Sequence, residues 1–333
     1  MRIDPRNLGL GTLVTHYLEG DNPHHAHITP LYQTSTYSFP DVQTSADTFD
    51  GKVDGFIYSR SDNPNVRQLA EKLAVLEGLD LLREANRSDV KDVVQGKVFS
   101  SGMAAISTAV LSLAKAGSTI ISQRVLYGNT YTLFKKIAPQ YDINVVYVEG
   151  SDLDEWEAAF AKYPNAVLAY LETPANPTMQ VLDIEAVARL AHARDAWVMV
   201  DNTFATPYCQ RPLTLGADVV AHSTTKYLAG HGLLIGGAIV TRHPEFLDPE
   251  KAQFVLTSRV LGGAPSPFDA WLTHIGLKTF ELRMQRHVEN AFQTARWLAD
   301  HPKVAQVFYP GLVDSPGHAI ARKQMVNGFG GML

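Results

Sequence analysis

The sequence predicts an α/β fold, with a mostly parallel seven-stranded sheet and helices on both of its faces. From about residue 98, short runs rich in β-branched residues alternate with helix-like segments, which is the pattern of a parallel sheet covered on both sides. The 333 residues also exceed the usual size of a single core, which favours one large domain and a smaller, partial one. The predicted strands are residues 97–100, 119–122, 144–148, 166–172, 197–201, 218–223 and 236–241.

Helices are predicted where apolar side chains recur at helical spacing. Residues 183–194 follow this pattern, and residues 104–114 are apolar enough for a buried helix. Further along the chain, the pattern is helical over 269–299 and then favours a short strand at 304–309. Residues 330–333 resemble the middle of another strand.

The chain divides into three predicted segments. Residues 1–63 are rich in Thr, Ser, Tyr, Pro and Asn with little periodicity, and we expect an arm that reaches a neighbouring subunit. Residues 64–260 would form the large domain, and residues 261–333 an incomplete C-terminal α+β domain. The charged segment 83–95 is predicted to be a solvent-exposed helical segment that contains no functional site.

The composition excludes several classes of function. A net charge of −5 without a long basic run gives no electrostatic footprint for nucleic acid or an anionic membrane, so we expect a small-molecule substrate. There is no apolar signal core and no stretch near the roughly 20 apolar residues that span a bilayer, which predicts a cytoplasmic protein. Cys209 is the single cysteine, and the cluster of His24, His25 and His27 lacks a partner motif, so no disulfide and no metal site are predicted.

The segment around Lys226 carries the strongest chemical signal. A predicted strand over 218–223 runs into hydroxyl groups and then into the lysine. Ser223 and Thr225 can donate hydrogen bonds to a phosphate, while a partly desolvated Lys226 could form a Schiff base with an aldehyde. A surface lysine beside hydroxyl groups is the commoner alternative, and this segment alone does not decide between them.

A second candidate is Asp201, at the end of the apolar strand 197–201. Ligands collect at strand ends in α/β sheets, and this carboxylate could pair with a protonated pyridine nitrogen. A helix-capping or turn aspartate is the alternative. The 25 positions between Asp201 and Lys226 allow one crossover and one further strand, so both can reach the same sheet edge.

Two further turns could complete such a site. Residues 98–106 have the pattern of a strand, a small-residue turn and a helix start, where Gly102 permits close approach and free amides could bind a phosphate. Tyr127 follows the next strand and could stack on an aromatic ring. A simple turn glycine and a buried core tyrosine are the alternatives.

Over about residues 25–333, the chain resembles the Cys/Met-metabolism family of pyridoxal-phosphate (PLP) enzymes. The resemblance rests on Ser101-Gly102-Met103-Ala104-Ala105, Tyr127-Gly128, Glu172-Thr173-Pro174-Ala175-Asn176-Pro177, Asp201-Asn202-Thr203 and the Lys226 segment. The family includes cystathionine γ-synthase, cystathionine lyases, methionine γ-lyase and O-acylhomoserine sulfhydrylases. The resemblance implies the type I fold of PLP-dependent transferases, PLP as cofactor and an amino-acid substrate such as a homoserine ester, cystathionine or methionine.

The resemblance also implies roles for individual residues. Lys226 would be the Schiff-base lysine and proton carrier, Asp201 the partner of the pyridine nitrogen, and Tyr127 a catalytic residue stacked on the ring. Tyr58 and Arg60 match family residues that reach the phosphate of the adjacent subunit, which implies a homo-oligomer, at least a dimer and by resemblance a tetramer of two dimers. The other implied contacts are a phosphate cradle of Gly102, Met103, Ser223 and Thr225, Asn176 near the ring hydroxyl, and Thr203 on the opposite ring face.

Two departures from the family pattern affect the expected substrate site. Family members continue beyond the position that matches Leu333, and the arginine that binds the substrate carboxylate lies in that part, so no residue here is assigned that role. Leu233 and Leu234 stand where many members carry an acidic residue. Local packing or substrate preference is therefore expected to differ.

The resemblance implies chemistry at the γ-carbon of the substrate. A thiol nucleophile would give γ-replacement, and water would give an α-keto acid and ammonia, as in a lyase. Residues 206–213 are similar to methionine γ-lyase, but Asn129 replaces the cysteine usual there, so both branches stay open. A different class also stays open. The chain could be a catalytically impaired assembly or binding protein that keeps the fold but lacks the arginine that binds the substrate carboxylate.

Overall fold

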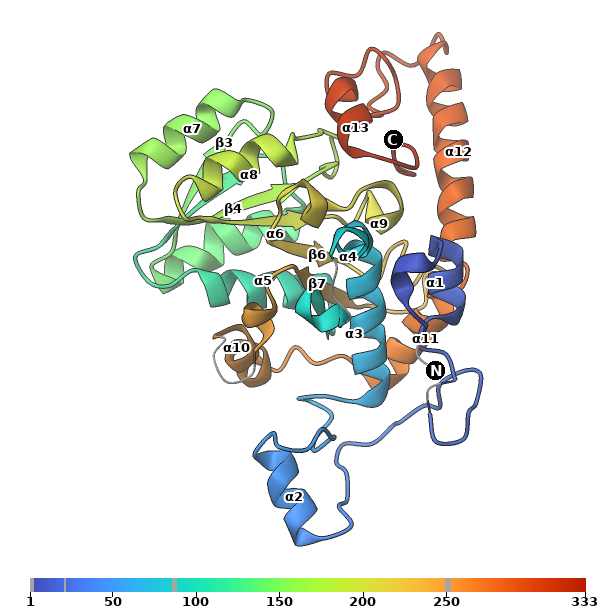
Figure 1. Ribbon diagram of the computed structural model, residues 1–333. Helices are drawn as coiled ribbons and strands as arrows, with labels where there is room; N and C mark the ends of the chain where they lie inside the picture. The colour runs from blue at the N-terminus through green and yellow to red at the C-terminus, as the bar shows by residue number, and fades with distance from the viewer. Residues whose placement is uncertain (1–2, 21, 86–88, 249–252) are drawn as a thin grey trace.

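The computed structural model describes residues 3–20, 22–85, 89–248 and 253–333, and its centre is a seven-stranded sheet. The strand order is β1-β7-β6-β5-β4-β2-β3, in which β7 runs antiparallel to both neighbours and the other pairs are parallel (Figure 1). The strands are β1 Gln95–Phe99, β2 Thr119–Gln123, β3 Asn144–Val148, β4 Ala166–Glu172, β5 Trp197–Asp201, β6 Val219–His222 and β7 Gly237–Thr241. The predicted fold class is confirmed.

Helices flank this sheet on both faces. The helices are α1 Leu10–His16, α2 Val42–Phe49, α3 Pro64–Glu77, α4 Leu79–Glu84, α5 Gly102–Leu113, α6 Gly128–Thr132, α7 Leu153–Lys162, α8 Ile184–His192, α9 Thr206–Cys209, α10 Gln253–Leu261, α11 Pro267–Leu277, α12 Phe280–Ala299 and α13 His318–Gln324. The predicted helices at 104–114 and 183–194 correspond to α5 and α8. Within the described residues, none of the helices combines the length and apolar character that crossing a bilayer requires.

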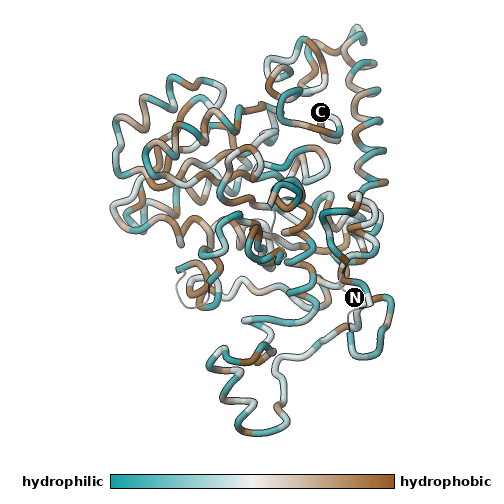
Figure 2. The backbone as a smooth tube through the Cα atoms, viewed as in Figure 1, coloured by the Kyte–Doolittle hydropathy of each residue, from teal (hydrophilic) through white to brown (hydrophobic). Residues whose placement is uncertain are grey.

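Side-chain alternation explains why both faces are covered. Successive residues of a strand point to opposite faces, so Ile120 and Met199 enter one core while Ile121 and Val200 enter the other. The first core packs against α5 and α10, and the second against α3, α7, α8 and α11. Figure 2 shows the resulting concentration of apolar residues along the central strands.

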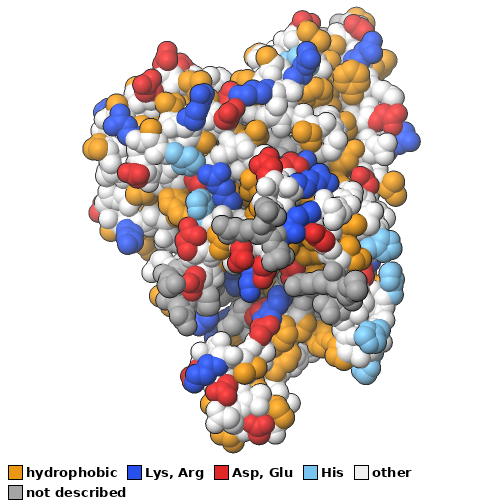
Figure 3. Space-filling model, in the orientation of Figure 1, with side chains coloured by type: hydrophobic (Ala, Val, Ile, Leu, Met, Phe, Trp, Pro, Cys, Tyr) orange, Lys and Arg blue, Asp and Glu red, His pale blue; other side chains and the backbone are white. Residues whose placement is uncertain are grey.

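The N-terminal segment contains both a core element and a protruding lobe. In α1, Leu13 and Val14 are buried in the main core. The loop that carries α2 instead stands away from the sheet (Figure 1), and Val42 and Phe49 on α2 are 86% and 64% exposed. Figure 3 shows apolar side chains interspersed with charged ones on this lobe. The predicted boundaries of the arm and the two domains stay predictions.

Three local expectations differ from the structure. The helix predicted over 269–299 divides into α11 and α12 at residues 278–279. The strands predicted at 304–309 and 330–333 are wrong, because no described segment pairs with either, and a strand needs a neighbour for its N–H and C=O groups. The Tyr309 hydroxyl donates to the carbonyl of Gly330 at 3.1 Å instead. In the charged segment 83–95, α4 ends at Glu84 and β1 begins at Gln95, while 86–88 lie outside the described residues.

Candidate active site

The carboxyl ends of β4, β5 and β6 and the start of α5 surround a cavity of about 390 Å³. Nine of the eleven predicted site residues line it: Gly102, Met103, Tyr127, Asn176, Asp201, Thr203, Ser223, Thr225 and Lys226. Ligands of α/β sheets bind at this edge, because the loops that follow parallel strands converge there. The structure therefore brings together side chains that lie up to 124 positions apart in the sequence, from Gly102 to Lys226.

Two carboxylates lie side by side at the floor of the cavity. Glu172 ends β4 and is the register partner of Asp201 at the end of β5. Asp201 accepts a hydrogen bond from the backbone N of Thr203 at 3.0 Å, and Glu172 accepts from the backbone N of Tyr127 and of Asn176, both at 2.8 Å. Their environment is poor in positive charge, since no lysine or arginine of the described residues forms an ion pair with either.

Burial governs the proton affinity of this pair. It raises the pKa of Asp201, against the hydrogen bonds from Thr203, and it raises the pKa of Glu172 to about 8, with repulsion from Asp201 adding to the effect. A cation near Asp201 would relieve this cost, because an opposite charge favours the ionised carboxylate. The floor of the cavity is thus suited to a positively charged ring nitrogen.

The opposite end of the cavity offers donors for an anion. Ser101 caps α5 by accepting from Ala104 N at 3.0 Å, which leaves the amides of Gly102 and Met103 at the helix start without a partner inside the helix. A Cβ on Gly102 would lie 3.0 Å from the Cβ of Ser223, so a side chain there would crowd the space. The Thr225 hydroxyl is already engaged, since it donates its proton to the carbonyl of Gly236 at 3.2 Å and accepts from the backbone N of Gly236 at 2.9 Å.

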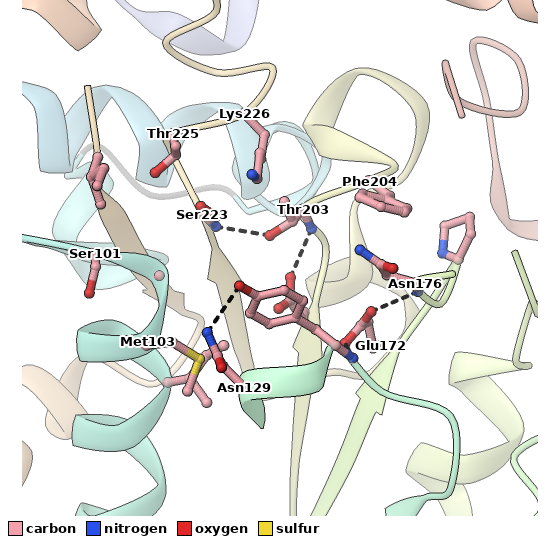
Figure 4. A pocket seen from close by; sticks show the side chains of 16 residues that line it. Ser101, Met103, Asn129, Glu172, Asn176, Thr203, Phe204, Ser223, Thr225 and Lys226 are labelled. Atoms are coloured by element: carbon pink, nitrogen blue, oxygen red, sulfur yellow. Dashed lines mark hydrogen bonds between the residues drawn. The ribbon is translucent and has the colours of Figure 1, made fainter. Parts of the chain in front are cut away.

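Lys226 and Tyr127 complete the walls of the cavity. Figure 4 shows the Lys226 side chain pointing into the space that Thr203 and Ser223 also line. Lys226 is exposed, so the expected partial desolvation is not observed; it lies at the open side of the cavity. Tyr127 is 42% exposed, and its hydroxyl accepts a hydrogen bond from Nδ2 of Asn129 at 3.2 Å.

Tyr58 and Arg60 lie outside this cavity. The guanidinium of Arg60 is 5.3 Å from the centre of the Tyr58 ring and donates to the carbonyl of Arg259 at 2.7 Å. Tyr58 is 40% exposed. Their predicted contact with the cofactor of an adjacent subunit stays a prediction.

Seven lining residues were not predicted as site residues from the sequence: Ser101, Ile106, Asn129, Glu172, Pro174, Phe204 and Ile235. Glu172 could have been found, because it ends an apolar strand in the same way as Asp201. The pairing of β4 with β5 that brings the two together is a long-range contact, which the local pattern does not reveal. Phe204 carries no signal that distinguishes it from a core aromatic residue.

The residues of the cavity fit PLP. The buried Asp201 carboxylate suits a protonated pyridine nitrogen, the start of α5 with Gly102 suits a phosphate, and the Lys226 amine lies on the same cavity. No group of three or more described His, Cys, Asp or Glu side chains could hold a metal ion.

Comparisons with known proteins identify the family of the chain. The sequence model of the family described as Cys/Met metabolism PLP-dependent enzyme matches residues 11–333. Methionine γ-lyase from Fusobacterium nucleatum subsp. polymorphum is 40% identical over 99% of this chain and 79% of its own length, and cystathionine γ-synthase from Mycobacterium bovis is 43% identical over 91% and 71%. The crystal structure of metB from Corynebacterium glutamicum superimposes with a TM-score of 0.87 at 37% identity, covering 99% of this chain and 78% of that one.

Proposed function

Because the chain belongs to the Cys/Met-metabolism family of PLP-dependent enzymes, we propose that it catalyses γ-replacement or γ-elimination on a sulfur-containing or O-acylated amino acid. The observation that carries the proposal is that Asp201 and Lys226 line one cavity with the start of α5. The two relatives of about 40% identity have names from both branches of this chemistry, so the branch is left to experiment.

Each end of the cavity has its own role in holding the cofactor. PLP, when bound, withdraws electrons from the α-carbon of the substrate and so lowers the cost of removing a proton there. Asp201, oriented by the backbone N of Thr203, would keep the ring nitrogen protonated. The amides of Gly102 and Met103 and the hydroxyl of Ser223 would bind the phosphate.

Lys226 is the residue that moves protons. Its side chain points into the cavity, and no hydrogen bond or ion pair holds its Nζ to another described residue. A free amine of this kind can bind the cofactor aldehyde, release it to the substrate, and take a proton from the α-carbon. Removal of a second proton, from the β-carbon, lets the γ-substituent leave; a thiol or water then completes replacement or elimination.

Tyr127 forms the wall next to this path. Its ring lines the cavity, and the hydrogen bond from Asn129 fixes the position of its hydroxyl. An aromatic ring at this place can stack on the cofactor ring. The same hydroxyl is within the cavity and can exchange a proton with a substrate group, which makes Tyr127 the second catalytic candidate.

A shared active site between subunits is part of the proposal. Arg60 and Tyr58 do not line the cavity of their own chain, and they follow in sequence the protruding lobe whose helix α2 exposes apolar side chains. We expect Arg60 to bind the cofactor phosphate of an adjacent subunit through its planar charged fork. The oligomer would be at least a dimer, which light scattering of the purified protein can measure.

Mixing two inactive variants tests the shared site. If Arg60 serves the neighbouring subunit, a hybrid of Arg60→Ala and Lys226→Ala chains contains one intact site, and mixing restores activity. If Arg60 serves its own subunit, each hybrid site has a defect and activity stays absent.

The activity itself is tested with a panel of substrates. The purified protein with PLP is incubated with O-acetylhomoserine, O-succinylhomoserine, cystathionine and methionine, each with and without sulfide or cysteine. We expect cystathionine or homocysteine from the γ-replacement branch, or an α-keto acid from the elimination branch. Lys226→Ala is the control and should abolish both the product and the visible absorbance of bound PLP. No product from any substrate, with PLP bound, would contradict the proposal.

A further inference from the structure

A buried carboxylate on α3 connects the two strands that end at the cavity. Glu77 is 1% exposed, and its Oε1 accepts hydrogen bonds from Nδ2 of Asn202 at 2.8 Å and from Nε2 of His222. Asn202 directly follows β5 and His222 is the last residue of β6. Both partners are fully or almost fully buried, at 0% and 1% exposure.

The alternation of side chains sets this connection behind the cavity. Asp201 and Ser223 line the cavity, whereas the residue next to each of them in sequence points toward α3 on the opposite face. On the cavity side of the strands, the backbone N of Ser223 donates to Oγ1 of Thr203 at 2.9 Å. The ends of β5 and β6 are therefore joined twice, once through Thr203 and once through Glu77.

The energy of this buried pair does not by itself reveal its role. Glu77 is the last residue of α3, where the helix dipole disfavours a negative charge. Oε2 of Glu77 and Nδ1 of His222 have no hydrogen-bond partner in the described part of the chain. Buried ion pairs with incomplete hydrogen bonding rarely stabilise a fold more than apolar residues of the same volume would. The location of the pair, rather than its energy, indicates what it does.

We propose that Glu77 is a positioning residue of the cofactor site, which holds the ends of β5 and β6 through Asn202 and His222 so that Asp201 and Ser223 stay in register for PLP. The inference rests on the cofactor contacts proposed above for these two residues. The pair also has an electrostatic effect: burial raises the pKa of Asp201, and attraction to His222 opposes the rise. Both effects favour an ionised, fixed carboxylate at the floor of the cavity.

The test is a PLP titration of the apoprotein, followed by visible absorbance and by circular dichroism of the bound cofactor. Glu77→Ala removes both hydrogen bonds, and we expect the Kd for PLP to rise about 10- to 100-fold and the dichroism of the bound cofactor to fall. Glu77→Gln keeps an acceptor oxygen for Asn202 and His222, so it should recover most of the affinity lost in the alanine variant.

Asp218→Asn is the matched control. Asp218 joins the same two strands at their opposite ends, because it directly precedes β6 and accepts a hydrogen bond from the backbone N of Val198 on β5 at 2.8 Å. Its carboxylate also contacts His192 and His243. This variant should lose stability without any change in the Kd for PLP. An equal rise in Kd for Asp218→Asn and Glu77→Ala would overturn the inference.

A second variant covers the case in which Glu77→Ala does not fold. His222→Asn breaks the contact to β6 and leaves the hydrogen bond from Asn202 to Glu77, so we expect a smaller but distinct rise in Kd. Unchanged affinity and dichroism in a folded Glu77→Ala or His222→Asn protein would refute the positioning role. Failure of the wild-type protein to bind PLP would instead refute the proposed cofactor contacts, which separates the two outcomes.

Discussion

Two buried groups of carboxylates differ in what balances their charge. The Glu19 side chain, 4% exposed, lies 2.6 Å from His274, 3.1 Å from Lys72 and 2.8 Å from Lys278. Burial alone would raise the pKa of Glu19, but hydrogen bonds from His274 and Lys278 and attraction to the cations lower it to about 2. The cluster joins the N-terminal segment to α3 and α11, so its charges serve the fold.

The carboxylates at the floor of the cavity are compensated only in part: no lysine or arginine of the described residues pairs with them, and hydrogen bonds from Thr203 and attraction to His222 offset only part of the cost of burying Asp201. Glu172 and Asp201 are neighbours, and burial raises the pKa of both. A buried carboxylate without full compensation is costly for folding and therefore indicates a missing cation. Glu19 is buried as well, so the feature that distinguishes Asp201 as a ligand contact is the lack of a lysine or arginine beside it, rather than its burial.

Removing the carboxylate of the compensated cluster should have the largest effect on stability. Glu19→Gln leaves Lys72, Lys278 and His274 without their anion, and breaking a buried pair costs about 3–5 kcal/mol of unfolding free energy. Urea unfolding measures this loss. Because none of these residues lines the cavity, the absorbance of bound PLP should not change, and a changed spectrum would mean that the cluster also serves the cofactor site.

The corresponding change in the cavity should affect catalysis instead. Asp201→Asn keeps the shape of the side chain but cannot hold a protonated ring nitrogen, so we expect kcat/KM to fall about 10²- to 10³-fold. Steady-state kinetics at saturating PLP measure this loss. The apoprotein should keep its stability or gain some, because a buried charge is removed; a large loss of stability would mean that Asp201 belongs to the fold like Glu19.

The contributions of Glu19 and Glu172 to the free energy of unfolding should also depend on pH in opposite directions. Because the pKa of Glu19 is lowered to about 2, its contribution is present above the unfolded value near 4.5 and is lost as the pH falls toward 2. The pKa of Glu172 is raised to about 8, so the folded apoprotein binds a proton that the unfolded chain has released, and stability falls as the pH rises from about 4.5 to 8.

Unfolding of the apoprotein at several pH values checks this difference. The stability of the wild type relative to Glu172→Gln should decrease between pH 4.5 and 8, by about 1.4 kcal/mol for each tenfold difference in proton affinity. A constant difference across this range would show that Glu172 stays ionised in the cavity.

A smaller effect is expected at the phosphate end. Gly102→Ala places a methyl group 3.0 Å from the Cβ of Ser223, which narrows the cradle, and we expect the Kd for PLP to rise about tenfold. Titration of the apoprotein with PLP measures this change. Gly9→Ala at the start of α1 is the control, since no atom lies within 4 Å of the added methyl group there. Equal affinities of the two variants would exclude close phosphate binding at Gly102.

The sequence predicts the sheet well because its central strands are buried on both faces. The run 166–171 contains no charged residue, and the ends of such strands place Asp201 and Lys226 at one edge. The strand predicted at 304–309 shows the limit of this reasoning, because an apolar run becomes a strand only where a neighbour pairs with it.

The parts of the site that escape prediction depend on contacts between distant segments. Glu172 gains its raised pKa from the pairing of β4 with β5, and Glu77 meets His222 across 145 positions of sequence. Lys226 is exposed although it lines the cavity, which no local pattern predicts. Sequence motifs therefore predict which residues are candidates for catalysis or cofactor binding. The packing of distant segments determines the pKa values of those residues.

Borohydride reduction of the PLP-loaded protein, followed by peptide mass mapping, tests the central claim most directly. We expect the mass of the reduced cofactor on the peptide that contains Lys226 and its absence in Lys226→Ala. Label on exposed lysines such as Lys52, or no label at Lys226, would contradict it.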